Sequence, residues 1–315
     1  MRFKVRNLVS HKLGAADNLD QLLRNAWGII NFQDKLWVVS NDKFPEETNY
    51  FVRVYSKTGL LLAAIEVFAA FPTGIAINKS KGFVVSSPDD SKNASCDWLV
   101  CTQNGAICGF SPLVDPLKAY VVVTSRRAFY TGIALHENNL YVADFNGRKI
   151  DTYDSNYNLI PLPFIDNTLP ADYFPFNIVV VKNELFVLYA KRDLQDPDPY
   201  NFLTGTGFGY ISVFNFDGTF VRRFVNQGEL NAPWGLIKSP KYCDKFKDAI
   251  LVGNNGDGNI NIYNKHGTFL GKLKDEDRNV IILDKLWGLS KDNCKVYFAS
   301  GPEYIHSLVG SISPK

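Results

Sequence analysis

The sequence is poor in the side chains that form metal clusters and disulfide frameworks. It has five cysteines and four histidines in 315 residues, with no CxxC pair and no HExxH motif. An odd number of cysteines, in a chain long enough to bury a core of its own, does not indicate a disulfide framework. The scattered histidines give no support for a structural zinc site. We therefore expect free thiols.

Charge excess and long apolar runs are also missing. Lysine and arginine number 34 against 32 aspartates and glutamates, a formal net charge of +2, and the arginines at 126–127 and 222–223 form isolated pairs. This balance disfavours nucleic-acid binding. The most apolar stretch, 59–71, is interrupted by Glu66 and is shorter than the roughly 20 residues that cross a bilayer. We therefore expect no nucleic-acid partner and no membrane partner.

The N-terminal segment lacks the apolar core of a secretory signal. Residues 1–20 alternate charged and apolar side chains, without the run of about 7–15 apolar residues that such a signal needs. The localisation stays open between a cytoplasmic protein, a protein packaged in a virion and a secreted form that has been processed.

Aromatic residues and turn formers are abundant. Phenylalanine, tyrosine and tryptophan make up 14% of the chain, alongside 23 glycines, 15 prolines and a single methionine. This mixture favours strands over helices. Outside 18–25, no window of roughly ten residues has sustained helical periodicity. The sequence therefore predicts an all-β fold.

A short motif recurs six times, at intervals of 45 to 58 residues. Its copies are Trp27-Gly28-Ile29, Thr73-Gly74-Ile75, Thr131-Gly132-Ile133, Phe176-Asn177-Ile178, Trp234-Gly235-Leu236 and Trp287-Gly288-Leu289. This spacing is typical of propeller blades with loop insertions. The predicted units are 27–70, 71–128, 129–172, 173–231, 232–284 and 285–315, the last joined by the N-terminal segment 2–10.

Further strand and turn signals follow each motif. The second strands are predicted at LWVVS (36–40), GFVVSS (82–87), LYVADF (140–145), LFVLYA (185–190), AILVGN (249–254) and KVYFAS (295–300). In the first five units a third strand is predicted to end in a turn, at 55–59, 101–105, 153–157, 214–218 and 263–267. Four of these turns end in glycine, which a hairpin position with positive φ favours.

The sixth unit runs out of chain before a fourth strand. The strand-like segment FKVRNLVS (3–10) is expected to complete its sheet, which removes an exposed edge. The sequence therefore predicts one domain over 1–315, a six-bladed β-propeller of four-stranded antiparallel blades closed by its N-terminal strand.

These motifs resemble an uncharacterised family of NHL-like six-bladed propellers, known mostly as predicted secreted bacterial proteins. Matching segments include FPTGIAIN (71–78), LYVADFNGRKIDTYD (140–154) and GELNAPWGL (228–236), and the resemblance extends over essentially the whole chain. It implies the propeller fold and no particular activity. More distantly, the architecture resembles the gluconolactonase and paraoxonase group of calcium-dependent hydrolases, by fold only.

Oxygen-bearing side chains at the expected channel mouth form a candidate metal site. Asp144, Asn177, Asn254 and Asp257 lie in three consecutive units, and calcium takes six to eight oxygen ligands. Asn177 is also the one non-glycine residue at the centre of the six motifs. Two alternatives stay open: Asn177 adopts a positive φ that glycine fills elsewhere, and the other three are ordinary turn residues.

The central glycines of the motifs are expected to form a ring, and we call them the ring glycines. Three tryptophans that directly precede ring glycines form a candidate binding wall. Because the first, fifth and sixth units are neighbours in a closed ring, Trp27, Trp234 and Trp287 are expected to lie side by side. Such a wall suits an apolar or carbohydrate-like ligand, although inner-strand aromatics also pack between blades. Asn41 and Asp42 in a mouth loop and Tyr189 in a second strand complete the predicted binding set.

Catalytic signals are weak. His306, with Glu303 three residues before it, is a candidate general base near the channel mouth, and a packed or surface histidine is the alternative. GTGFG (205–209) and GNNGDGN (253–259) lack the Lys-Ser/Thr ending and following helix of a phosphate loop.

The sequence favours a non-catalytic propeller that presents its loop face to a protein or glycan partner. The fourth unit carries about ten extra residues within 193–210, which belong to that face. Alternatives are a calcium-dependent hydrolase of the lactonase or esterase type and a structural component that self-assembles through an exposed apolar patch.

Overall fold

The computed structural model describes residues 2–43, 49–198, 200–241, 246 and 248–315. Over these residues it consists of strands and turns, with the short 3-10 element η2 (Pro302–Tyr304) and no α-helix. The four cysteines in this part, Cys96, Cys101, Cys108 and Cys294, are free as predicted. Cys243 lies outside the described residues. The described residues contain no helix that is long and apolar enough to cross a membrane.

The first and second units share an eight-stranded sheet. The first contributes β3 (Ala26–Phe32), β4 (Lys35–Ser40), β5 (Tyr50–Tyr55) and β6 (Leu61–Val67). The second contributes β7 (Pro72–Ile77), β10 (Trp98–Thr102), β11 (Ala106–Phe110) and β12 (Lys118–Thr124). The outermost strands β6 and β12 pair in parallel, so the two antiparallel sets join at their outer edges.

The next three units each form an antiparallel sheet of their own. The third has β13 (Tyr130–His136), β14 (Asn139–Asp144), β15 (Lys149–Asp154) and β16 (Leu159–Ile160). The fourth has β17 (Tyr173–Val181), β18 (Glu184–Arg192), β20 (Gly209–Phe214) and β21 (Phe220–Asn226), with β19 (Phe202–Leu203) paired to β18. The fifth has β22 (Pro233–Lys238), β23 (Ile250–Asn254), β24 (Ile260–Tyr263) and β25 (Phe269–Lys272).

The N-terminal strand joins the C-terminal sheet, as predicted. The last unit supplies β26 (Leu286–Lys291), β27 (Val296–Ser300) and β28 (Leu308–Pro314). Strand β1 (Phe3–Ser10) pairs antiparallel along β28, and the short β2 (Asn18–Leu19) pairs with β1. The two ends of the chain are therefore held in one sheet.

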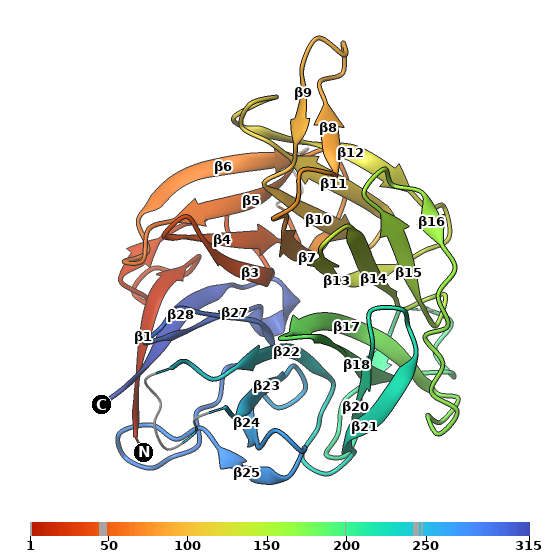
Figure 1. Cartoon of the computed structure of the whole chain (residues 1–315). Coiled ribbons are helices and arrows are strands. Elements are labelled where there is room, and N and C mark those ends of the chain that lie inside the picture. The colour runs from red at the N-terminus through yellow and green to blue at the C-terminus, as the bar shows by residue number, and fades with distance from the viewer. Residues whose placement is uncertain (1, 44–48, 199, 242–245, 247) are drawn as a thin grey trace.

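The motif strands form the centre of the molecule. Strands β3, β7, β13, β17, β22 and β26 contact one another in this order, and β26 contacts β3. Figure 1 shows the sheets radiating from this centre, with β6, β12, β16, β21, β25 and β1 toward the outside. This arrangement is a β-propeller.

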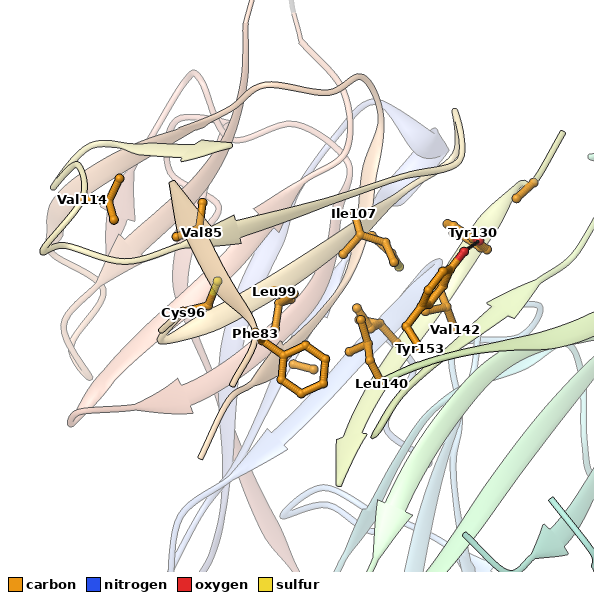
Figure 2. Packing of buried hydrophobic residues seen from close by; sticks show 14 residues of the cluster. Phe83, Val85, Cys96, Leu99, Ile107, Val114, Tyr130, Leu140, Val142 and Tyr153 are labelled. Atoms are coloured by element: carbon orange, nitrogen blue, oxygen red, sulfur yellow. Dashed lines mark hydrogen bonds between the residues drawn. The ribbon is translucent and has the colours of Figure 1, made fainter. Parts of the chain in front are cut away.

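The strand assignment within the second unit was wrong. The segment GFVVSS holds β8 (Val84–Ser86), which pairs with β9 (Asn93–Ser95) in a separate hairpin that projects from the sheet (Figure 1). The second strand is β10, so the turn at 101–105 joins the second and third strands. The alternation of apolar and polar residues in 82–87 led to the wrong strand, because Phe83 and Val85 are buried although they lie outside the blade sheet. They belong to a buried cluster with Leu99 and Leu140, in the packing between two units (Figure 2).

The turn chemistry was predicted correctly. The five predicted turn ends all have positive φ: 90° at Gly59, 77° at Gly105, 65° at Tyr157, 81° at Gly218 and 87° at Gly267. Tyrosine at the third position adopts the same left-handed conformation as the four glycines.

The motif glycines serve close packing, which corrects the expectation about φ. None of them has a positive φ. A Cβ on Gly28 would lie 2.7 Å from the main-chain oxygen of Thr73, and one on Gly288 would lie 2.4 Å from that of Trp27. Neighbouring inner strands thus approach too closely for a side chain. Asn177, likewise without a positive φ, instead donates from Nδ2 to the main-chain oxygen of Trp234 at 2.7 Å.

A register irregularity occurs in all six inner strands at the motif. It lies between Ala26 and Ile29, Pro72 and Ile75, Tyr130 and Gly132, Pro175 and Asn177, Pro233 and Gly235, and Leu286 and Leu289. Irregularities of this kind change the direction of a side chain and are common beside functional sites. The residues that precede the ring glycines and Asn177 all fall within these breaks.

Candidate functional site

A cavity of about 450 Å³ lies at the loop end of the inner strands. Seven of its described lining residues are aromatic: Trp27, Phe129, Phe176, Tyr200, Phe202, Trp287 and Tyr304. The other five are Asn25, Asn41, Gln103, Asp198 and Asn201. We call this space the mouth cavity. Its volume is in the range of small-molecule sites.

The three predicted tryptophans are packed together beneath the mouth cavity. The rings of Trp27 and Trp287 stack with centroids 3.6 Å apart, and Trp234 meets both with its edge, at 6.1 and 5.9 Å. Trp27 and Trp287 line the mouth cavity, whereas Trp234 lines a second cavity of about 290 Å³ between the inner strands, the channel cavity. The tryptophan cluster therefore separates the two spaces and forms the floor of the mouth cavity.

The insertion in the fourth unit forms one wall. The ring of Tyr200 stacks on Phe129 at 4.0 Å, and Phe202 packs against Phe176 at 4.7 Å. The Oδ1 atom of Asp198 accepts the main-chain N–H of Tyr200 at 2.9 Å, which closes a local turn. The insertion thus carries aromatic rings onto a face formed mainly by other units.

Asn41 of the first unit and Asn25, just before that unit, contribute amide groups to the lining. Asn25 Nδ2 donates to Asn41 Oδ1, and Asn41 Nδ2 donates to the main-chain oxygen of Pro72, both at 3.0 Å. These two hydrogen bonds fix the orientation of both side-chain amides. Asn25 has a φ of 44° and Tyr304 a φ of 60°, conformations that cost energy in non-glycine residues and concentrate at functional sites.

Three buried polar atoms of the cavity residues have no hydrogen-bond partner among the described residues. They are Asn25 Oδ1, Trp27 Nε1 and Trp287 Nε1. Unpaired buried polar groups are uncommon in folded proteins. Two of the three are indole N–H donors of the floor, which the contacts within the described residues leave without an acceptor.

Two of the predicted metal ligands cap turns. Asp144 Oδ1 accepts the main-chain N–H groups of Phe129 at 3.0 Å and Gly147 at 2.9 Å. Burial raises the pKa of Asp144, and these two hydrogen bonds act in the opposite direction. Asp257 Oδ1 accepts the N–H of Asn259 at 3.1 Å. Both carboxylates therefore accept main-chain hydrogen bonds, as turn residues do.

The two predicted amide ligands are also engaged. Asn177 bridges to the fifth unit through Trp234 and lines the channel cavity, and Asn254 Nδ2 donates to the main-chain oxygen of Glu229 at 2.8 Å. The described residues contain no group of three or more histidine, cysteine, aspartate or glutamate side chains placed to hold a metal. The calcium site stays a prediction.

The predicted catalytic pair does come together. His306 Nε2 lies 3.0 Å from Glu303 Oε2, and His306 Nδ1 lies 2.8 Å from His11 Nε2. The two imidazoles stack with centroids 4.4 Å apart, and the N–H of Ser307 donates to His11 Nδ1. Because His11 Nδ1 accepts, His11 carries its proton on Nε2 and donates it to His306, which in turn donates to Glu303. These hydrogen bonds connect the residue after β1 to the residues just before β28, beside the mouth cavity.

Of the remaining predicted binding residues, one lines the mouth cavity and two do not. Asn41 lines the mouth cavity, whereas Asp42 lies outside the lining and pairs with Arg24 at 3.6 Å. Tyr189 lies elsewhere, buried beside Arg148 and Asp166 in a cavity of about 340 Å³. Sequence reasoning missed Tyr200, Phe202 and Tyr304. The length of the insertion was the available signal for the first two.

Sequence relatives come from a virus. The uncharacterized proteins L690 and R648 of Acanthamoeba polyphaga mimivirus are 38% and 37% identical to this chain, over 98% of its length in both cases. The matches cover 85% and 80% of those two proteins. The chain belongs to their family. No family model matches it, so the resemblance to NHL-like propellers is not confirmed as a family relationship.

Solved structures with similar folds are propellers of several kinds. A catalytically inactive virginiamycin B lyase from Staphylococcus aureus matches with a TM-score of 0.59 and 12% identity, over 100% of both chains. The WD40 propeller domain of Doa1 matches with 0.55 and 11%, over 99% of this chain and 97% of that one. A nidogen/laminin complex matches with 0.52 and 15%, over 89% and 84%. At these identities the likeness concerns the fold.

Proposed function

We propose that this chain is a non-catalytic, six-bladed propeller scaffold that binds a partner at its loop face, with the mouth cavity as the binding site. Each of the six repeat units would be one blade of a single domain. The six motif strands that contact one another in a closed ring support this count. The pairing of β1 with β28 supports closure by the N-terminal strand.

The mouth cavity is the observation that carries the proposal. It combines a floor of packed indoles, an aromatic wall brought by an insertion, and amides with fixed orientation. Sites that bind small molecules or parts of a larger partner are mostly apolar, with a few oriented polar groups. The partner would be a protein or a glycan that places one group in this cavity. One neighbour in fold is a nidogen/laminin complex and another is the WD40 propeller domain of Doa1, so the fold occurs in a protein complex.

The calcium-dependent hydrolase is the weaker alternative. It requires Asp144, Asn177, Asn254 and Asp257 to present free oxygens to one ion. In the structure Oδ1 of each carboxylate caps a turn, and Asn177 Oδ1 accepts the N–H of Ile178. Asn254 Oδ1 is buried without a hydrogen-bond partner among the described residues, while its Nδ2 donates to the main-chain oxygen of Glu229. His306 and Glu303 face each other and His11, at the seam between the two ends of the chain. These contacts favour a structural role for the six residues.

A thermal-shift screen with chemically varied small molecules tests the proposal. A ligand at about 100 times its Kd stabilises a protein by about 2.7 kcal/mol, which is several degrees in Tm. We expect hits that stabilise the wild-type chain and lose their effect in Tyr200→Ala. Phe220→Ala is the matched control, because Phe220 is 40% exposed, similar to Tyr200 at 42%, and lies outside the cavity. Hits that act equally on both variants would contradict the proposed site.

A further inference from the structure

The charge of the mouth cavity restricts what it can bind. Its described lining contains one carboxylate, Asp198, four side-chain amides and seven aromatic rings, without a lysine, arginine or histidine. The ammonium group of Lys285 lies over the ring of Tyr304 and is not part of the described lining, so an anionic ligand would meet Asp198 without a cationic donor in the lining. The lining therefore disfavours phosphates, sulfates and carboxylates.

A cationic ligand is disfavoured by a positive charge already in place. The ammonium nitrogen of Lys285 lies 4.8 Å from the ring centroid of Tyr304, where it occupies one face of a cavity aromatic. Aromatic cages for cations use free ring faces that surround the charge. Here a second cation would approach Lys285 and would leave the unpaired indole N–H groups of Trp27 and Trp287 without acceptors.

A neutral ligand rich in hydroxyl groups matches both kinds of surface. Side-chain amides offer donors and acceptors together, and a hydroxyl both donates and accepts. The apolar face of a sugar ring packs on an aromatic ring. Tyr200 and Tyr304 provide such rings, because they are 42% and 38% exposed and come from two different units. Phe129 supports Tyr200 from behind at 4.0 Å.

We infer that the mouth cavity binds a neutral sugar ring, such as the terminal residue of a glycan, stacked on Tyr200 or Tyr304 above the indole floor. The inference rests on the proposed function and names its ligand class. The volume of about 450 Å³ is in the range that accommodates a small ligand. The side-chain amides of Gln103 and Asn201, two of the described lining residues, supply hydrogen-bonding groups.

Tryptophan emission titrations test the inference, because three of the five tryptophans lie at the floor. The probes are cellobiose, N,N′-diacetylchitobiose, lactose and mannobiose as neutral disaccharides, tetramethylammonium chloride as a cation and sodium sulfate as an anion. We expect at least one disaccharide to change the emission with saturation. Tyr200→Ala or Tyr304→Ala should weaken it at least tenfold, whereas Phe220→Ala should leave it unchanged.

Three results would overturn the inference. The first is saturable binding of tetramethylammonium or sulfate, lost in Tyr200→Ala, without binding of any disaccharide. The second is disaccharide binding that neither tyrosine variant affects. The third is the absence of binding by any of these probes. The proposed function fails only if the wider thermal-shift screen also finds no ligand that depends on Tyr200, so the two failures are distinguishable.

Discussion

Substitution of Gly288 by alanine should loosen the ring of inner strands where the first and last units meet. The added Cβ would lie 2.4 Å from the main-chain oxygen of Trp27, 2.8 Å from Ile29 Cγ2 and 3.0 Å from the Ile29 nitrogen. Two of these atoms belong to the main chain, so a rotamer change cannot relieve the overlap. Overpacking typically costs about 1–3 kcal/mol, and we expect the upper end, about 3 kcal/mol.

Chemical denaturation and thermal melting measure this loss. At about 2 °C per kcal/mol for a large domain, the Tm should fall by about 6 °C. The main chain of Trp27 must also move, so the Trp27–Trp287 stack at 3.6 Å should open and the tryptophan emission should shift. Gly14→Ala is the control, because a Cβ there meets no atom within 4 Å and tests only the positive φ of 77°. Its cost should be about 1 kcal/mol, with unchanged emission. A Gly288→Ala chain as stable as the Gly14→Ala chain would refute the packing explanation.

Three further perturbations test the contacts around the mouth. Burial lowers the pKa of His11 from its ordinary value of 6.5, and the charges of His306, Arg24 and Lys12 act in the same direction. The stability that neutral His11 contributes is therefore complete above about pH 6.5, and it is lost as the pH falls through the lowered pKa. Denaturation between about pH 8 and about pH 5 should show this slope in the wild-type and His266→Gln chains but a smaller one in His11→Gln, and equal slopes would disprove the coupling. Asp144→Ala leaves the buried N–H of Phe129 and the partly buried N–H of Gly147 without an acceptor and should cost about 2 kcal/mol by urea denaturation, with or without a chelator; a loss that wild type reproduces when calcium is removed would instead indicate a metal ligand. Asn177→Gly removes the donor to the Trp234 carbonyl and should cost about 1–3 kcal/mol, and a melting curve identical to wild type would show that this bridge is dispensable.

Much of the architecture could be predicted because it repeats. The alternation of buried residues gives strands, the motif spacing gives units, and the turns at Gly59, Gly218 and Gly267 fall where positive φ is required. The second unit failed because the hairpin of β8 and β9 has the same alternation as a blade strand. Periodicity reports burial on one face and does not tell which neighbouring strand pairs with it.

The candidate site could be predicted only in part. The side-by-side packing of Trp27, Trp234 and Trp287 followed from their equivalent positions in adjacent units, and the structure confirms it. Tyr200 and Tyr304 could not be found in this way, because they lie in loops with no counterpart in the other units. The role of the ring glycines was also misjudged, since close approach between inner strands is a property of the assembled ring and leaves no local signal.

The most direct test of the mouth cavity as a binding site is ¹⁹F NMR of the chain labelled with 5-fluorotryptophan. Trp27, Trp234 and Trp287 report on the floor of the cavity, and Trp37 and Trp98, which contact each other at 5.9 Å between the first two units, serve as internal controls. With a ligand from the thermal-shift screen, we expect the three floor resonances to shift while those of Trp37 and Trp98 stay in place. Shifts confined to Trp37 and Trp98, or no shift at the floor under saturating ligand, would contradict the site.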